Sequence, residues 1–330
     1  MDKKPYNIVH LSDLHLTPGI RIGRTEVSAP GRNLHGMNST FRTILQTEEV
    51  QSADALLVTG DVTDAGDRAS WQVFRKAVQK YVPDHHTLVV AGNHDVCEME
   101  RGFAFSDLFG ALTQAKQRAK LVRLAGNLEL IDQPAEYPWS AVLNDEHKRV
   151  MVIALDSNHS GHFSLADNAV GRIGQEQLDE LENILKKCSD PEKKSSFVPV
   201  RIVTIHHSPN IPRYDTLVKR GILPKRSGAR KLIGKSKGMF VRWTHQIPAE
   251  ERRRLRELCA KYRVRLMAHG HMHEAMDRRV KGVRIIGAPA STQPLPGRGK
   301  KRVQFYRYSV RGNGGRLEPT LVTVEVEGLF

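Results

Sequence analysis

The feature of this sequence that most constrains its fold is a series of apolar runs, each ending in a short polar motif. Five such motifs occur in order along the chain: Asp13-x-His15, Gly60-Asp61, Gly92-Asn93-His94-Asp95, His206-His207 and Gly270-His271-x-His273. Short apolar runs followed by turn signals are typical of buried strands. In an open α/β sheet, ligands bind outside the carboxyl ends of the strands. We therefore expect the five motifs to converge on one edge of a sheet.

Between these motifs the predicted elements alternate between strand and helix. A first strand begins at Ile8, and the apolar runs predict further strands at 55–59, 87–91, 200–205 and 264–268. Helical spacing of apolar residues predicts helices at 39–51, 70–82, 103–124, 174–188 and 248–262, with Gly126 as the C-cap of the third. A hairpin is expected from 139–143 and 149–155, and antiparallel strands at 283–286, 303–310 and 321–326.

Composition narrows the class of protein. The 330 residues are 39% hydrophobic, and the sequence contains no segment typical of a signal peptide and no apolar run long enough for a transmembrane segment. Three scattered cysteines, Cys97, Cys188 and Cys259, argue against a disulfide framework. We therefore expect a cytoplasmic protein.

The net charge of +15 is concentrated in one segment, 211–246. Residues 213–242 contain ten Lys or Arg and a single acid, Asp215, interleaved with aliphatic and aromatic residues. Such a segment is either a solvated loop or a basic lid beside the active site, and in the second case it could place the protein against an anionic membrane surface. A strongly positive charge also attracts phosphorylated small molecules and nucleic acid.

Taken together, the five motifs resemble those of the calcineurin-like metallophosphoesterase family, over about Ile8 to Ser291. Asp156-Ser157 and the stretch Gly171–Leu178 resemble the subset that contains class III cyclic-nucleotide phosphodiesterases. The resemblance implies an α/β fold: a four-layer α/β/β/α sandwich of two mixed sheets flanked by helices, formed by residues 1–330 as a single domain with the basic insert at about 211–246.

The resemblance also implies roles for individual residues. Asp13, His15, Asp61 and His273 would hold one metal ion, and Asp61, Asn93, His206 and His271 the second, with Asp61 bridging. His94 would act as general acid, oriented by Asp64 or Asp95. We favour His206 over His207 because it directly ends the strand, whereas an extended backbone would turn His207 away. His207, His162 and His35 are weaker candidates for substrate contacts.

Two divalent cations are the expected cofactors. A mixed nitrogen and oxygen ligand set suits Mn or Fe, and also Zn or Co, better than Mg or Ca. Paired cations about 3.5–4 Å apart lower the pKa of bound water towards roughly 7, so hydroxide becomes available at neutral pH.

The expected function is a metal-dependent phosphoesterase that hydrolyses a small phosphodiester such as a cyclic nucleotide. The alternatives are a pyrophosphohydrolase acting on a nucleotide-linked lipid such as UDP-2,3-diacylglucosamine, for which segment 211–246 would suit a membrane surface, and a nuclease. A basic binding module without catalysis would bind no metal and turn over no substrate.

Overall fold

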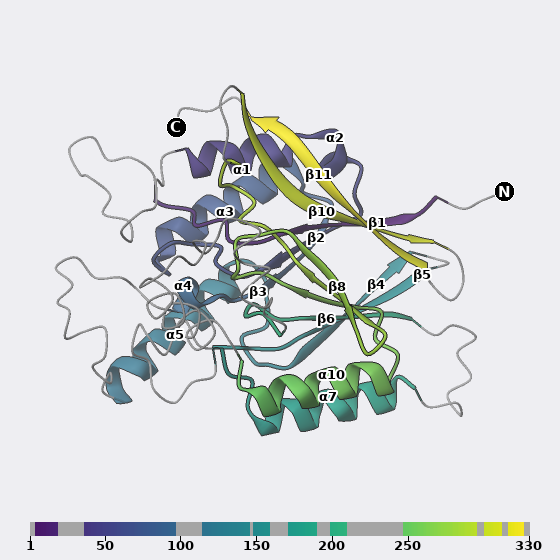
Figure 1. Ribbon diagram of the computed structural model, residues 1–330. Helices are drawn as coiled ribbons and strands as arrows, with labels where there is room; N and C mark the ends of the chain where they lie inside the picture. The colour runs from purple at the N-terminus through teal and green to yellow at the C-terminus, as the bar shows by residue number, and fades with distance from the viewer. Residues whose placement is uncertain are drawn as a thin grey trace, which may run out of the picture.

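The computed structural model describes residues 4–18, 36–96, 114–145, 148–158, 171–189, 199–209, 247–295, 300–311 and 316–326. Two mixed β-sheets lie face to face, and helices cover the outer face of each (Figure 1). This arrangement confirms the predicted four-layer α/β/β/α sandwich. Within the described part of the chain, none of the helices has both the length and the apolar character needed to cross a bilayer.

The first sheet has the strand order β11-β10-β1-β2-β3. Strands β1 (Tyr6–Leu11), β2 (Ala55–Thr59) and β3 (His86–Val90) are parallel, and β10 (Lys301–Arg311) pairs antiparallel with β1. Strand β11 (Arg316–Val326) extends the sheet as the partner of β10. The C-terminal strands therefore complete the sheet that the N-terminal strand begins.

The second sheet has the order β4-β5-β6-β7-β9-β8. Its parallel strands are β5 (Lys148–Ala154), β6 (Val200–Thr204), β7 (Leu266–His269) and β9 (Val283–Gly287). Antiparallel strands close both edges: β4 (Trp139–Asp145) and β8 (Met276–Val280). The apolar-run criterion missed β8, because this edge strand carries Asp277, Arg278 and Arg279 between two apolar ends.

Three apolar clusters separate the layers. Ile8, Leu57 and Ile202 belong to the cluster between the two sheets. A second cluster packs the first sheet against α1 (Met37–Leu45), α3 (Arg68–Tyr81) and α5 (Gln114–Leu130). A third packs the other sheet against α7 (Gln175–Lys187) and α10 (Ala249–Lys261). The cores thus fix the two sheets with their polar strand ends on a common side.

Two helix predictions need correction. The helix expected at 39–51 is divided into α1 and α2 (Glu48–Gln51), because Thr47 adopts an extended conformation and its hydroxyl donates to the carbonyl of Ile44 at 2.8 Å. Gly126 lies inside α5 rather than capping it. The left-handed cap is Asp132, with a φ of 56°, and the next amide, that of Gln133, donates back to Leu128 at 2.9 Å. The predicted helical residues 103–113 lie outside the described chain.

Candidate metal centre

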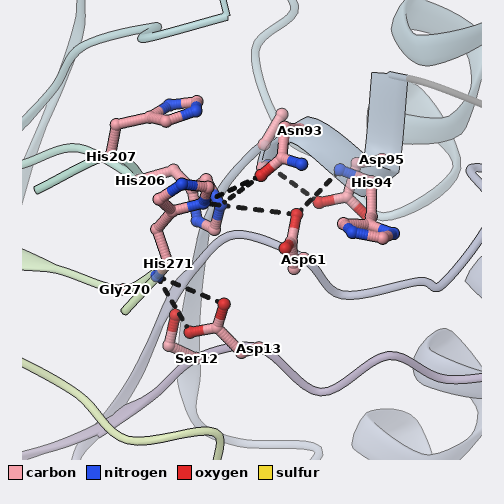
Figure 2. A network of polar contacts seen from close by, with 12 residues as sticks. Ser12, Asp13, Asp61, Asn93, His94, Asp95, His206, His207, Gly270 and His271 are labelled. Atoms are coloured by element: carbon pink, nitrogen blue, oxygen red, sulfur yellow. Dashed lines mark hydrogen bonds and ion pairs between the residues drawn. The ribbon is translucent and has the colours of Figure 1, made fainter. Parts of the chain in front are cut away.

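The predicted ligand residues gather at the carboxyl edge of the two sheets. Among the described residues, Asp13, His15, Asp61 and His273 form one group of closely spaced ligand atoms, and Asp61, His206 and His271 form another. Asp61 belongs to both groups. Figure 2 shows Asp61 facing the rings of His206 and His271, with the carboxylate of Asp13 below them. The arrangement offers two adjacent cation sites with one shared carboxylate.

In the first group, side chains from opposite ends of the sequence meet. The Nε2 atom of His273 lies 3.2 Å from Oδ1 of Asp13 and 3.3 Å from Nε2 of His15. The same His15 nitrogen lies 3.8 Å from Oδ2 of Asp61. Two carboxylates and two imidazoles therefore turn their ligand atoms toward one point.

In the second group, Asn93 completes the set. Its side-chain oxygen lies 3.0 Å from Nε2 of His206 and 3.0 Å from Nδ1 of His271 (Figure 2). The His206 nitrogen also lies 3.4 Å from Oδ1 of Asp61. A turn at 93–96 (α4, Asn93–Val96) brings Asn93 here, and the His94 amide at its second position donates to Asp61 at 2.8 Å.

The backbone at these positions is unusual. The described chain contains eight non-glycine residues with positive φ, and five are candidate ligands: Asp13, His15, Asp61, His271 and His273. Asp and His tolerate the left-handed region better than most residues. Strands β1, β2 and β7 thus end in sharp turns that direct these five ligand side chains into the site.

Glycines make room for these turns. A Cβ atom on Gly60, whose φ is 91°, would overlap the ring of His206, and one on Gly270 would overlap the hydroxyl of Ser12. The glycines of the motifs therefore let ligand-bearing loops approach one another closely, which the sequence alone could not distinguish from ordinary turn glycines.

The carboxylates carry the charge a cation requires. Burial acts to raise the pKa of Asp61, but the imidazoles around it, chiefly His206 and His94, hold that pKa well below its ordinary value. Burial also acts to raise the pKa of Asp13, but His273 and His206 together lower it below its ordinary value. Burial lowers the pKa of His15 to about 4, so its ring is neutral and able to ligate.

His206 is fixed by a contact behind the site. Its Nδ1 donates to the carbonyl oxygen of Thr59 at 2.7 Å, which leaves Nε2 to face Asp61 and Asn93. Burial alone would lower the pKa of His206, but the neighbouring carboxylates raise it to about 9. A cation bound at Nε2 would displace the proton there. The hydrogen bond from Nδ1 to Thr59 fixes the tautomer of His206, and such a bond is typical of histidines that ligate metals.

The candidate general acid lies beside the first group. The Nδ1 atom of His94 contacts the backbone oxygen of Asp64 at 2.8 Å, and its ring meets that of His15 edge to face at 4.8 Å. The carboxylate of Asp64 lies 3.2 Å from Nδ1 of His15 and 3.9 Å from Nδ1 of His94. Asp64 therefore positions both rings, and its backbone carbonyl makes the closest contact to His94.

The alternative orienting residue, Asp95, bonds to the backbone of the neighbouring loops. Its buried carboxylate accepts hydrogen bonds from the amides of Val62, Thr63 and Gly92 and from the Thr63 hydroxyl, at 2.9 to 3.2 Å. Burial raises the pKa of Asp95 to about 6. Asp95 ties the two loops that carry Asp61 and Asn93 together.

His207 does not turn away as an extended backbone would require. The chain bends after β6, and the His207 ring lies 4.3 Å from that of His271, while its Nδ1 contacts the Ser157 hydroxyl at 2.7 Å. His207 is thus beside the second group and outside its set of ligand atoms. The predicted contacts His35 and His162, and the basic segment 211–246, lie outside the described residues.

The Asp156-Ser157 motif and helix α7 form one structural unit. The side-chain amide of Gln177 clamps the backbone of Asp156, accepting from its N–H at 2.9 Å and donating to its carbonyl at 3.0 Å. Asn158 then donates to the carbonyl of Ala91 at 2.9 Å, next to the Gly92-Asn93 turn. The sequence pattern contained both stretches, but it gave no sign that Gln177 supports the turn holding His207.

The donor set fits two divalent cations, because it combines ionised carboxylates, an amide oxygen and imidazole nitrogens around a shared Asp61. Comparison with known protein families agrees with this chemistry, since the model of the calcineurin-like phosphoesterase family matches residues 6–275. The chain belongs to the calcineurin-like phosphoesterase family.

Solved structures are similar to the chain at low sequence identity. A purple acid phosphatase from yellow lupin (Lupinus luteus) is 13% identical with a TM-score of 0.50, and the match covers 98% of this chain and 54% of that one. A putative 5′-nucleotidase from Staphylococcus aureus is 14% identical with a TM-score of 0.48, covering 98% and 55%. The chain therefore spans about half the length of these two proteins. No curated protein sequence matches it.

Proposed function

We propose that this calcineurin-like phosphoesterase hydrolyses a small phosphodiester, such as a cyclic nucleotide, with two divalent cations at the candidate metal centre. The observation that carries the proposal is the sharing of Asp61 between two groups of ligand atoms, with His94 held beside them. The proposed ligands are Asp13, His15, Asp61 and His273 for one cation and Asp61, Asn93, His206 and His271 for the other. Mn or Fe suits this set best, with Zn or Co as alternatives.

The cations would supply Lewis acidity toward the phosphoryl oxygens and a water of lowered pKa. The side chains of the protein would position the substrate and supply the proton for the leaving group. With Nδ1 of His94 bonded to the Asp64 carbonyl, its Nε2 is the ring atom available to protonate the departing oxygen. An alkoxide needs such a proton to leave, and the departing oxygen of a cyclic nucleotide is an alkoxide.

Two divalent cations would carry +4 and the ionised Asp13 and Asp61 return −2, so the centre would attract a phosphate of either type, and charge does not select the diester. The support for a diester comes from the two stretches that resemble the cyclic-nucleotide phosphodiesterase subset, Asp156-Ser157 and Gly171–Leu178. Gln177 bonds to the backbone of Asp156, and Ser157 contacts His207 beside the second ligand group.

A substrate panel on Mn-reconstituted protein tests the proposal. We expect kcat/KM for bis(p-nitrophenyl) phosphate to exceed that for p-nitrophenyl phosphate at least tenfold, and a cyclic nucleotide to open to the nucleoside monophosphate. The Asp61→Asn variant is the matched control, since it keeps the side-chain size and removes the shared charge. Faster turnover of the monoester would contradict the proposal.

The same panel includes a nucleotide-linked lipid and duplex DNA. The pyrophosphohydrolase and nuclease alternatives rest on the net charge and on segment 211–246. Faster hydrolysis of the nucleotide-linked lipid than of the small diester would favour the first alternative, and faster hydrolysis of DNA would favour the second.

A further inference from the structure

A strongly basic cavity lies away from the candidate metal centre. It has a volume of about 620 Å³, and its cationic lining residues are Arg263, Arg265, Arg279, Lys281, Arg284 and Arg316, with Glu318 as the single carboxylate. Its lining also includes apolar residues, among them Val264, Val283 and Leu317. The cavity combines several positive charges with apolar groups against which an organic group could pack.

The cavity is at the opposite edge of the second sheet from the candidate metal centre. Its lining includes Arg265 and Val283, at the start of β7 and β9, whereas His271 follows the end of β7. In Figure 1 strand β1 runs from the side of the N-terminus toward the side of α4, which carries Asn93. The length of β7, about 13 Å at ~3.3 Å per residue, separates the two edges. A ligand in the cavity therefore does not touch the metal centre.

Three of the six cations have carboxylate partners. Lys281 lies 3.2 Å from Glu257, Arg316 lies 2.8 Å from Glu318, and Nε of Arg284 donates to Asp277 at 2.8 Å. The other three, Arg263, Arg265 and Arg279, form no ion pair with any residue that the structure describes, and their side chains are exposed at the cavity. The lining thus carries an uncompensated excess of positive charge.

The placement of Arg263 adds to this observation. It occupies the left-handed position after α10, with a φ of 53°, and the next amide donates back to Cys259 at 2.8 Å. Glycine usually takes this position because it adopts positive φ without strain. An arginine here places a guanidinium at the cavity at a conformational cost.

From the cavity and its uncompensated arginines we infer a second ligand site that binds a small anion with several phosphate groups, such as a nucleoside triphosphate. Guanidinium groups pair with phosphate oxygens in a bidentate manner. Arg263 and Arg265 come from the α10–β7 connection and Arg279 comes from β8, on two sides of the cavity. A ligand that pairs with all three guanidinium groups needs two or more anionic groups. The concave shape and the volume lie in the range of small-ligand pockets, whereas a membrane or a duplex would require a convex or flat basic face.

Isothermal titration of the full-length protein with sodium tripolyphosphate at physiological salt tests the inference. The test variant is Arg265→Gln/Arg279→Gln, and the matched control is Arg253→Gln, an exposed arginine of α10 outside the cavity. We expect saturable binding that weakens at least tenfold in the test variant and less than twofold in the control. Diesterase turnover and the melting temperature should stay unchanged in both, which verifies folding and an intact metal centre.

A second arm separates the cavity from the metal centre. In the Asp61→Asn background, tripolyphosphate binding attributed to the cavity should persist. Its loss there, or equal affinity in the test and control variants, would overturn the inference. If a duplex DNA probe binds and responds to the cavity arginines while tripolyphosphate does not bind, the site serves nucleic acid and the small-anion inference is wrong.

Discussion

His10 should make the stability of the metal-free protein depend on pH. It lies buried in the middle of β1, with Nδ1 2.5 Å from the Tyr308 hydroxyl and Nε2 2.8 Å from the Thr59 hydroxyl. Burial, aided by the nearby His269, lowers its pKa to about 3, and the Asp13 carboxylate opposes the shift only in part. Because both partners are hydroxyl groups, the neutral ring has both nitrogens satisfied, and protonation inside the sheet is unfavourable.

The sign and size of the effect follow from linkage. Between pH 6.5 and 3 the unfolded chain binds a proton at His10 that the folded chain does not, so stability falls as pH falls through this range. With an unfolded pKa of ~6.5, the loss between pH 7 and pH 5 is about 2 kcal/mol. A His10→Gln variant cannot take up this proton, so its stability should decline by about 2 kcal/mol less over the same interval.

Urea unfolding of metal-free protein at pH 7 and pH 5, followed by circular dichroism, measures the difference. The His10→Gln variant loses stability at pH 7 because two buried hydrogen bonds are disturbed. That loss cancels when the change in unfolding free energy from pH 7 to pH 5 is compared between the variant and the wild type. His86→Gln serves as control, since its side chain is exposed at the start of β3. An equal decline in wild type and His10→Gln, within about 0.5 kcal/mol, would refute the reasoning.

Three further predictions concern the metal centre. Asp61→Ala should reduce metal content, measured by plasma mass spectrometry, from two ions per chain to fewer than one, and turnover by more than about a thousandfold. His94→Gln should keep both ions and lower kcat by roughly a hundredfold, less for a p-nitrophenolate leaving group than for an alkoxide; an unchanged kcat would exclude the general-acid role. Ser157→Ala should release the His207 ring and lower kcat/KM several-fold at unchanged metal content, and a loss of metal would show that His207 supports the ligands instead.

The convergence of the ligands within each sheet could be predicted from sequence because it depends on strand direction: parallel strands end on the same edge. The meeting of Asp13 and Asp61 with His206 and His271 also requires the face-to-face packing of the two sheets. The same logic failed for β8, whose two apolar ends enclose charged residues. It also misplaced the end of α5, since Asp132 rather than Gly126 takes the left-handed cap.

Side-chain partners within the turns could not be predicted, because they depend on backbone angles that sequence does not reveal. Asp64 and Asp95 are both carboxylates close to the metal motifs, yet one contacts His94 and the other anchors the Gly92 turn. Strand position favours His206 over His207, but it does not predict the bend that brings the His207 ring against that of His271.

The positive φ angles of the ligands connect the fold to its chemistry. Left-handed conformations cost of the order of 1–3 kcal/mol for residues other than glycine, and five candidate ligands adopt them. Hydrogen bonds hold two of these turns across the sheet edge: the Asp13 amide donates to Gly60 at 3.0 Å, and the His15 amide to Asp61 at 2.9 Å. Glycine would remove the strain but also the ligand. The packed sheets therefore maintain a strained set of turns that holds the ligand atoms of the two groups close together.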